Sequence, residues 1–292
     1  GSDENISIFN LAKLIAEHNF KRLPKVKVKK RNLNKKENYI PNVNELKKLK
    51  LLPKISLKEQ IEEGLNYYYR KQIKKIIAFD LDGTLVNSGV DLINSLNQLL
   101  IEKKQRIVKI EDVKSLVGNG AAAMIKKAYN LNNKSISNKK VDLYKARFLE
   151  IYKKNFLKNT KLFPYVKGTL KHLHENNYII LLISNKPEYF VKRIVSALGI
   201  KKYFSVVTGG DTYNFRKPDK RHLTKTIEKL GLKKYECLFV GDSLPDALCA
   251  KRTKSKLVLL SHGYSQENID NMGADLILDS FSQFKKELSK LI

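Results

Sequence analysis

The sequence predicts an α/β fold in which a Rossmann-like parallel sheet has helices on both faces, with an inserted helical cap and a mostly helical N-terminal extension. Three observations lead to this prediction. From about residue 160 onward, short apolar segments alternate with helical patterns, as they do in parallel sheets. A block of helical patterns alone follows the first apolar segment. A lysine-rich segment precedes both.

Residues 1–73 are predicted to form the N-terminal extension, whose first two residues we interpret as the remnant of an expression tag. One helix is expected from Ser7 and another from Ser56. Ser56 and Glu59 have the spacing of a capping box, in which each side chain accepts a hydrogen bond from the other residue's backbone N–H. The extension is therefore expected to be mostly helical.

The core of the fold is predicted to comprise residues 74–86 and 160–292. Lys75–Phe79 is a short apolar segment that ends in acidic residues, and we expect it to be the first strand. Helical patterns separate the later strands, which favours a parallel sheet covered on both faces. These later strands are predicted at Tyr178–Ser184, Phe204–Thr208, Glu236–Val240, Lys256–Leu260 and Asp275–Leu278.

Residues 87–159 are predicted to form the helical cap. Gly118-Asn119-Gly120 breaks the helical pattern in its middle. Open α/β sheets bind ligands at the carboxyl ends of their strands, so we expect the cap to cover that edge. Its helices are predicted at Asp91–Lys103, Ala121–Tyr129 and Lys139–Phe156.

The formal net charge of +28 raises the question of nucleic-acid binding. The lysines are spread along the whole chain, and the densest stretch, Lys21–Lys36, has no interleaved aromatic side chains for stacking on bases. We interpret this stretch as a solvated loop or edge strand. Nucleic acid is therefore not an expected partner, and the positive charge is of general use in attracting anionic substrates.

The chain is expected to be cytoplasmic and free of membrane association. No apolar run approaches the roughly 18–20 residues of a membrane-spanning helix, and the N-terminus lacks the pattern of a signal peptide. Cys237 and Cys249 lie in a strand pattern and a helix pattern, and we interpret them as buried thiols of a reduced compartment. The sequence does not indicate an oligomeric state.

Four polar motifs follow predicted strands or the loops after them. They are Asp80-Leu81-Asp82-Gly83-Thr84, Ser184-Asn185, Lys217-Pro218, and the segment from Gly241 to Asp246. Parallel strands end at a common edge of their sheet, so we expect the four motifs to meet there. This edge is the predicted active site.

The residue types in these motifs suit the hydrolysis of a phosphate ester. Such a reaction needs a nucleophile, a proton for the leaving oxygen and positive charge around the phosphoryl oxygens. Asp80 can be the nucleophile and form an aspartyl-phosphate, and Asp82 can act as general acid and then as general base. Asp80, Asp82 and Asp242 are the predicted ligands of Mg²⁺, a hard cation that prefers oxygen.

The remaining motif residues are predicted to bind phosphate or to support the site. Ser184 and Asn185 can donate hydrogen bonds to phosphoryl oxygens, and Lys217 can add a positive charge. Asp246 is expected to orient Lys217 or a metal-bound water. The supporting residues are Gly83, Thr84 and Asp246.

Over residues 74–292 the chain resembles the haloacid dehalogenase superfamily. The resemblance rests on Asp80, Asp82 and Thr84, followed by Ser184, Lys217 and the pair Asp242 and Asp246. It implies a phosphate-transferring enzyme with a helical cap. Dehalogenases of the superfamily lack the general acid at the position of Asp82, because a halide leaves without a proton. Asp82 therefore favours a phosphatase or a phosphomutase.

Further motifs resemble the phosphoglycolate phosphatase subfamily: Ser184-Asn185-Lys186-Pro187, Gly209-Gly210-Asp211, Arg216-Lys217-Pro218 and Val117–Ala121. The resemblance implies that Asn119 and Lys186 contact the substrate, a small phosphorylated metabolite. Two simpler interpretations stay open. Asn119 between glycines also fits a left-handed turn, and Lys186 also fits an exposed surface position. Asn87, where relatives often have Asp, is interpreted as neutral to the mechanism.

Residues 5–70 resemble, more weakly, the C-terminal tail of extended short-chain dehydrogenases that act on nucleotide sugars. The shared features include Tyr39-x-Pro41, Pro53 and Ser56-Leu57. The Gly-rich loop and the Tyr-x-x-x-Lys pair of those enzymes are missing, so the segment cannot be an oxidoreductase by itself. Either the natural chain has an epimerase-like domain upstream, or the segment is a remnant that packs on the phosphatase or a partner.

The sequence therefore favours a Mg²⁺-dependent phosphatase for a small phosphate monoester, either phosphoglycolate or a sugar phosphate of carbohydrate metabolism. A phosphosugar mutase of the same superfamily is one alternative. A non-catalytic binding or assembly module that uses the basic N-terminal segment is the other. His262 is expected in a surface loop and His222 at a surface or packing position, since neither has metal-ligand spacing.

Overall fold

The computed structural model describes residues 56, 59–64, 73–232 and 234–292, and the chain divides into two compact units, Gly1–Ile73 and Lys74–Ile292. In the first unit, residues 59–64 are helical. The Ser56 N–H donates to Glu59 Oε2 at 2.7 Å, and the Glu59 N–H donates to Ser56 Oγ at 3.2 Å. The predicted capping box is therefore confirmed. The helix from Ser7 and the dehydrogenase-like residues before Ser56 lie outside the described residues.

A parallel sheet forms the centre of the second unit. The described residues give it six strands in the order β5-β4-β1-β6-β7-β8, every neighbouring pair being parallel. Phe79 pairs with Leu182 on one side and with Val240 on the other, so β1 lies between β4 and β6. The predicted fold class is confirmed. The strands are β1 (Lys74–Phe79), β4 (Ile179–Ile183), β5 (Val206–Thr208), β6 (Tyr235–Gly241), β7 (Lys256–Leu260) and β8 (Leu276–Leu278).

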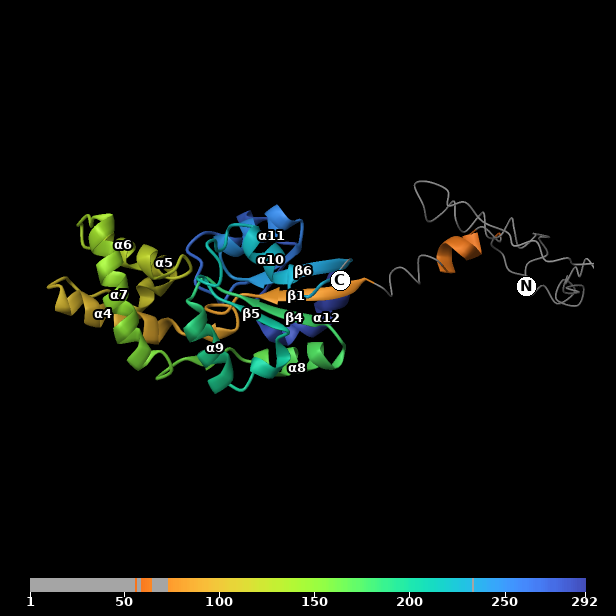
Figure 1. Cartoon of the computed structure of the whole chain (residues 1–292), viewed down its shortest axis with the longest axis horizontal. Coiled ribbons are helices and arrows are strands. Elements are labelled where there is room, and N and C mark those ends of the chain that lie inside the picture. Colours follow the sequence, from red (N-terminus) through yellow and green to blue (C-terminus); the bar gives the residue numbers. More distant parts are fainter. Residues whose placement is uncertain (1–55, 57–58, 65–72, 233) are drawn as a thin grey trace, which may run out of the picture. The chain divides into compact units, whose positions relative to one another are not determined.

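Helices cover both faces of this sheet (Figure 1). The side chains of β1 alternate between two buried clusters, with Ile77 and Phe79 in one and Ile76 and Ala78 in the other. Burial on both faces explains why the strands are continuous apolar runs. One face packs on α8 (Val166–Glu175), α9 (Glu188–Ala197) and α12 (Phe281–Leu291), and the other on α10 (Arg221–Glu228) and α11 (Leu244–Thr253).

A helical insertion follows β1 and lies beyond the carboxyl end of the sheet (Figure 1). Two short strands that were not predicted, β2 (Val86–Asn87) and β3 (Lys161–Leu162), pair antiparallel where the chain enters and leaves it. Strands of two residues leave no periodicity in the sequence. The insertion consists of α4 (Gly89–Glu102), η1 (Ile110–Asp112), α5 (Val113–Leu116), α6 (Ala121–Leu131) and α7 (Asn138–Asn155).

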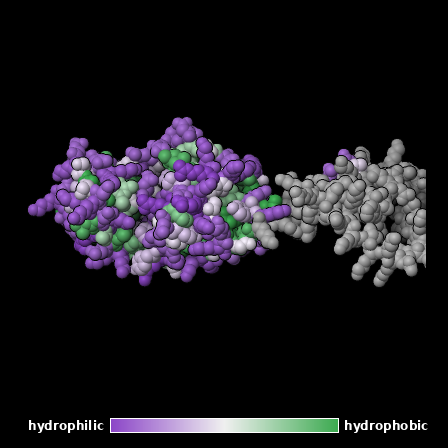
Figure 2. Space-filling view, turned by 45° about the horizontal axis from the view of Figure 1, so that its top comes forward, coloured by the Kyte–Doolittle hydropathy of each residue, from purple (hydrophilic) through white to green (hydrophobic). Residues whose placement is uncertain are grey.

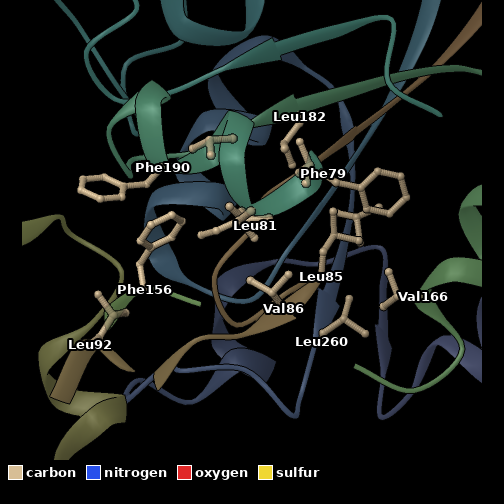
Figure 3. Close-up of a cluster of buried hydrophobic side chains, with 14 of the residues drawn as sticks. Phe79, Leu81, Leu85, Val86, Leu92, Phe156, Val166, Leu182, Phe190 and Leu260 are labelled. Atoms are coloured by element: carbon tan, nitrogen blue, oxygen red, sulfur yellow. The ribbon is translucent and has the colours of Figure 1, made fainter. Parts of the chain in front are cut away.

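The insertion and the sheet share one hydrophobic core. Figure 3 shows Leu92 and Phe156 of the insertion beside Phe190 of α9. The rings of Phe156 and Phe190 are 5.3 Å apart between centroids and meet edge to face. Aromatic pairs of this kind add stability beyond the area that they bury, and this pair joins the insertion to α9.

Asp91 joins the two linkers of the insertion, which sequence reasoning did not foresee. It lies in the first turn of α4 and is 1% exposed. Its carboxylate accepts hydrogen bonds from the backbone N–H groups of Asn159 and Thr160 at 2.9–3.0 Å, and from the Thr160 hydroxyl at 2.8 Å. The end of the insertion is thereby held against its beginning.

We expect Asp91→Ala to lower the free energy of unfolding by about 2–4 kcal/mol, because it leaves the buried N–H and hydroxyl of Thr160 unpaired. Urea denaturation checks this value. Asp142→Ala, on the exposed face of α7, is the matched control and is expected to change stability by less than about 0.5 kcal/mol. Equal stability of the two variants would contradict an anchoring role for Asp91.

Hydrophilic residues cover most of the visible face of the second unit (Figure 2). Among the described residues, no helix is both long and apolar enough to cross a membrane. Cys237 and Cys249 are buried free thiols, as predicted. His222 is fully buried and so has a packing position, and His262 lies in the loop after β7, as expected. That imidazole is half-buried against the Phe163 ring, with centroids 4.1 Å apart.

Candidate active site

Three of the predicted motifs begin at the carboxyl ends of adjacent central strands. Asp80 follows β1, Ser184 follows β4, and Asp242 follows β6. The Asp80 N–H donates to the Val240 carbonyl at 2.9 Å, so the ladder continues to the first motif residue. The remaining motif, Lys217-Pro218, lies between β5 and α10. The topology thus brings all four to one edge.

Lys217 links two of these motifs. Its ammonium lies 2.5 Å from Asp80 Oδ1 and 2.7 Å from Asp246 Oδ1, and all three residues are buried. Burial alone would lower the pKa of Lys217, but Asp246 and Asp80 outweigh it and raise that pKa. The lysine is therefore a fixed positive charge beside Asp80.

Asp246 contacts this lysine, as one of its two predicted roles requires. Its second oxygen, Oδ2, accepts hydrogen bonds from the Ser243 hydroxyl at 2.8 Å and from the Ser243 N–H at 3.1 Å. Ser243 is the N-cap of α11, and Asp246 is the third residue of that helix in a capping box. The start of α11 therefore sets the direction of the carboxylate that holds Lys217.

Asp242 is fixed by the two loops beside it. Its Oδ1 accepts a hydrogen bond from the Thr84 hydroxyl at 2.7 Å, and its Oδ2 accepts one from the Tyr264 N–H at 2.8 Å. Gly83 has a φ of +87°, and a Cβ there would lie 2.4 Å from Asp242 Oδ2. Glycine is required at this position for both reasons.

A divalent cation would fit between the carboxylates. Asp80, Asp242 and Asp246 are buried, and each offers an oxygen within 4.8 Å of the others. Burial raises the pKa of Asp80 to about 7 and that of Asp242 well above its ordinary value, with Lys217 opposing the rise at Asp80. A cation would restore their ionised forms, and an all-oxygen donor set suits a hard cation such as Mg²⁺.

This cluster differs from the predicted ligand set in containing Asp246 instead of Asp82. The Asp82 carboxylate is turned toward Ser88, whose hydroxyl donates to Oδ1 at 2.5 Å, and toward Lys186, whose ammonium lies 2.7 Å from Oδ1 and 2.9 Å from Oδ2. Both oxygens of Asp246 are already hydrogen-bonded. Asp80 and Asp242 are therefore the two residues common to the predicted ligand set and the observed acidic cluster.

Lys186 is not a plain surface residue, because its side chain is only 5% exposed. Burial opposes its charge, but the nearby Asp82 carboxylate outweighs burial and raises the pKa of Lys186. Its ammonium also lies 4.9 Å from the centre of the Tyr152 ring. Lys186 therefore joins the core loop after β4 to the last helix of the insertion.

A cavity of about 60 Å³ lies between the sheet core and the helical insertion of the second unit. Asp80, Asp82, Ser184, Asn185 and Lys186 line it from the core. The insertion contributes apolar side chains and two glycines. These are Leu92, Val117, Gly118, Gly120, Ala121, Met124, Phe148, Leu149 and Tyr152.

The loop Gly118-Asn119-Gly120 reaches the core at this cavity. The Asn185 amide donates to the Lys217 carbonyl at 3.0 Å and to the Gly118 carbonyl at 3.4 Å. Gly118 and Gly120 have positive φ, but Asn119 does not, and its side chain is exposed. The left-handed positions of the loop are thus the glycines. The sequence-predicted contact of Asn119 with substrate remains a prediction.

Sequence reasoning missed Tyr264. Besides its N–H contact with Asp242, its hydroxyl accepts from the Ser88 and Gly89 N–H groups at 2.9 Å and donates to Asn87 Oδ1 at 2.9 Å. It therefore ties the start of α4 to Asp242. Its position shortly after β7, next to β6, was the only signal in the sequence.

The arrangement can transfer a phosphoryl group. Asp80 faces a cavity, has a fixed cation beside it and shares a metal-sized acidic cluster with Asp242. Asp82 lies on the same cavity, where it can exchange a proton with a leaving oxygen. Nucleophile, charge compensation and proton donor are the three requirements of phosphate-ester hydrolysis.

Comparison with known proteins agrees with this chemistry. Residues 76–260 match the family model of haloacid dehalogenase-like hydrolases. A phosphoglycolate phosphatase of Agrobacterium fabrum is 32% identical over 225 residues, which is 75% of this chain and 97% of that protein. One of Vibrio parahaemolyticus is 38% identical over 72% of this chain and 93% of its own length.

A solved structure gives the same result. The crystal structure of a predicted phosphoglycolate phosphatase from Haemophilus somnus 129PT is similar with a TM-score of 0.68 and 33% sequence identity. The similarity covers 74% of this chain and 98% of that one.

Proposed function

Because the chain belongs to the haloacid dehalogenase-like hydrolases, we propose that it is a Mg²⁺-dependent phosphatase that hydrolyses a small phosphate monoester, foremost 2-phosphoglycolate, with Asp80 as nucleophile. It is a phosphoric monoester hydrolase of the phosphoglycolate phosphatase-like type. The observation that carries the proposal is the buried chain of contacts from Asp80 through Lys217 to Asp246 at the cavity. The names of the relatives support the choice of substrate.

In the first half of the proposed reaction, an Asp80 oxygen attacks phosphorus and the ester bond to the leaving group breaks. Asp82 gives its proton to the leaving oxygen, so the product departs as a neutral alcohol group. Lys217, Ser184 and the backbone N–H groups around them compensate the charge on the phosphoryl oxygens. The result is an aspartyl-phosphate on Asp80.

In the second half, a water molecule attacks the aspartyl-phosphate. Asp82, now a carboxylate, accepts a proton from this water, and Asp80 is released with inorganic phosphate as the product. Lys186 and Ser88 hold the Asp82 side chain in place for both proton transfers. Water as acceptor distinguishes this reaction from that of a phosphosugar mutase, which passes the phosphoryl group to a second hydroxyl.

Asp80 and Asp242 would hold the Mg²⁺, with Thr84 and Tyr264 keeping Asp242 in position. When bound, the cation lowers the repulsion between an anionic nucleophile and an anionic phosphate. Asp246 accepts hydrogen bonds from Lys217 and Ser243, and it acts as a positioning residue for Lys217.

We expect phosphate release from 2-phosphoglycolate to fall at least about 100-fold when EDTA removes the metal, and to return on addition of Mg²⁺. The measurement is a phosphate assay on a panel of 2-phosphoglycolate, hexose phosphates and pyrophosphate, with product analysis for transferred phosphate. Ca²⁺ is the matched control, because its larger size and looser geometry suit the compact cluster less well. Activity that survives EDTA would contradict the metal requirement, and transfer to a hexose phosphate would establish a mutase.

A further inference from the structure

Tyr152 carries an unpaired hydroxyl in the wall of the active-site cavity. The residue lies on α7 of the insertion and is 1% exposed. Its hydroxyl has no hydrogen-bond partner among the described residues. A buried hydroxyl without a partner costs about 1–3 kcal/mol, so such groups in a ligand cavity commonly await a ligand.

The position of this hydroxyl is well determined by packing. The Tyr152 ring stacks on Phe148 at 5.6 Å and meets Phe156 at 6.0 Å and Phe190 at 5.0 Å between centroids. Burial raises the pKa of Tyr152 to about 12, so the hydroxyl keeps its proton at neutral pH. Tyr152 thus offers one fixed hydrogen-bond donor to whatever fills the cavity.

A second donor lies beside it. The Lys186 ammonium contacts both oxygens of Asp82 and lies beside the Tyr152 hydroxyl, so it adds a positive charge next to that donor. The ammonium sits 4.9 Å from the Tyr152 ring centre. The Asp82 charge next to it is compensated by Lys186 and by the Ser88 hydroxyl. Two donors side by side suit an acceptor with two oxygens.

The lining of the cavity limits what that acceptor can belong to. Apart from Tyr152, its polar side chains come from the core, at Asp80, Asp82, Ser184, Asn185 and Lys186. The other walls, among them Met124, Phe148 and Leu149, offer no partners for the hydroxyls of a sugar.

We propose that Tyr152 is a specificity-determining residue that, together with Lys186, binds the carboxylate of a compact phosphorylated hydroxy acid. The proposal rests on the proposed function and deepens it, because it explains how the cavity distinguishes such an acid from a sugar phosphate. Neither resemblance to a family nor any sequence motif singles out Tyr152. Its role follows from a core–insertion contact that only the fold creates.

The test compares 2-phosphoglycolate with ethyl phosphate, which has the same length without the carboxylate. We expect Tyr152→Phe to lower kcat/KM for 2-phosphoglycolate about 10- to 100-fold, the value of a hydrogen bond to a charged group, and to leave ethyl phosphate unchanged. The Tm of the free protein is expected to stay or rise, since an unpaired buried hydroxyl is removed. Tyr165→Phe, at an exposed tyrosine, is the control and is expected to change neither substrate.

Three outcomes would overturn the inference. An equal loss on both substrates, with a lower Tm, would mean that Tyr152 only supports the fold. No loss on either substrate would mean that its hydroxyl does not touch the substrate, while the proposed function would stand. A wild-type protein that is folded but hydrolyses neither ester would overturn the proposed function and this inference with it.

Discussion

Asp80→Asn is expected to abolish phosphate release from 2-phosphoglycolate, with a loss of at least about 10⁴-fold in kcat. The amide has nearly the shape of the carboxylate and can still accept the hydrogen bond that Lys217 donates at 2.5 Å. It is, however, a poor nucleophile and a weaker partner for a divalent cation. The variant should therefore fold and lose the chemistry.

The measurement is a phosphate assay joined to a search for the covalent intermediate. Wild type quenched in acid during turnover should carry phosphate on Asp80, detected by mass spectrometry of the peptide that contains it. The variant should carry none. Asp142→Asn, at an exposed position on α7, is the matched control and should keep full activity. A variant at Asp80 with a tenth or more of wild-type activity would rule out this residue as the nucleophile.

The sheet and its motifs were predictable because their causes are local in sequence. A strand such as Lys256–Leu260 is buried on both faces and is therefore a continuous apolar run, and its observed bounds equal the predicted ones. Asp80, Ser184 and Asp242 each follow such a run directly. Once the strands are taken as parallel neighbours, the meeting of these residues at one edge needs no further information.

What the sequence could not predict depends on contacts between distant segments. The partner of Asp82 is Lys186, 104 positions away, and the pairing arises only when the β1 and β4 loops are placed side by side. Tyr264 reaches Asp242 and α4 from the loop after β7. The periodicity of the surrounding sequence does not indicate this role of Tyr264. The role depends on where the fold places the backbone N–H and the phenol hydroxyl of the residue.

The insertion shows both situations at once. Its three long helices follow from apolar residues at helical spacing, and they differ from the predicted bounds by two residues or fewer. The bonds that fix its ends, from Asp91 to Asn159 and Thr160, join residues 68 and 69 positions apart. A single aspartate in a first helical turn gives no sign of that role, since the same residue type is common there for its interaction with the helix dipole.

Lys217→Met is expected to lower both activity and stability. Activity should fall about 100- to 1,000-fold, because a fixed positive charge beside the reacting phosphate is lost. The free energy of unfolding should fall by about 3–5 kcal/mol at pH 8, because Asp80 and Asp246 are left buried without their partner. Methionine keeps the unbranched stem of lysine up to Cε, so the volume buried beside Phe239 should change little.

The stability loss should depend on pH in a direction that tests its cause. In the wild type, Lys217 opposes the effect of burial on the pKa of Asp80. Removing the lysine therefore raises the pKa of the buried carboxyls further. A folded pKa above the unfolded value means that the folded variant binds protons more readily. Its deficit should thus be small near pH 5 and grow as the pH rises to 8. Urea denaturation in EDTA across this range measures the deficit.

A double-mutant cycle with Asp246→Asn separates charge from packing. The amide removes one of the two carboxylates that Lys217 leaves behind, so the double variant should be more stable at pH 8 than Lys217→Met alone and equally inactive. Recovery of stability without recovery of activity would assign the structural effect to the Lys217–Asp246 pair and the catalytic effect to the charge beside Asp80. Additive losses, unchanged between pH 5 and 8, would instead mean that Lys217 contributes through packing, and the proposed role of its charge would have to be abandoned.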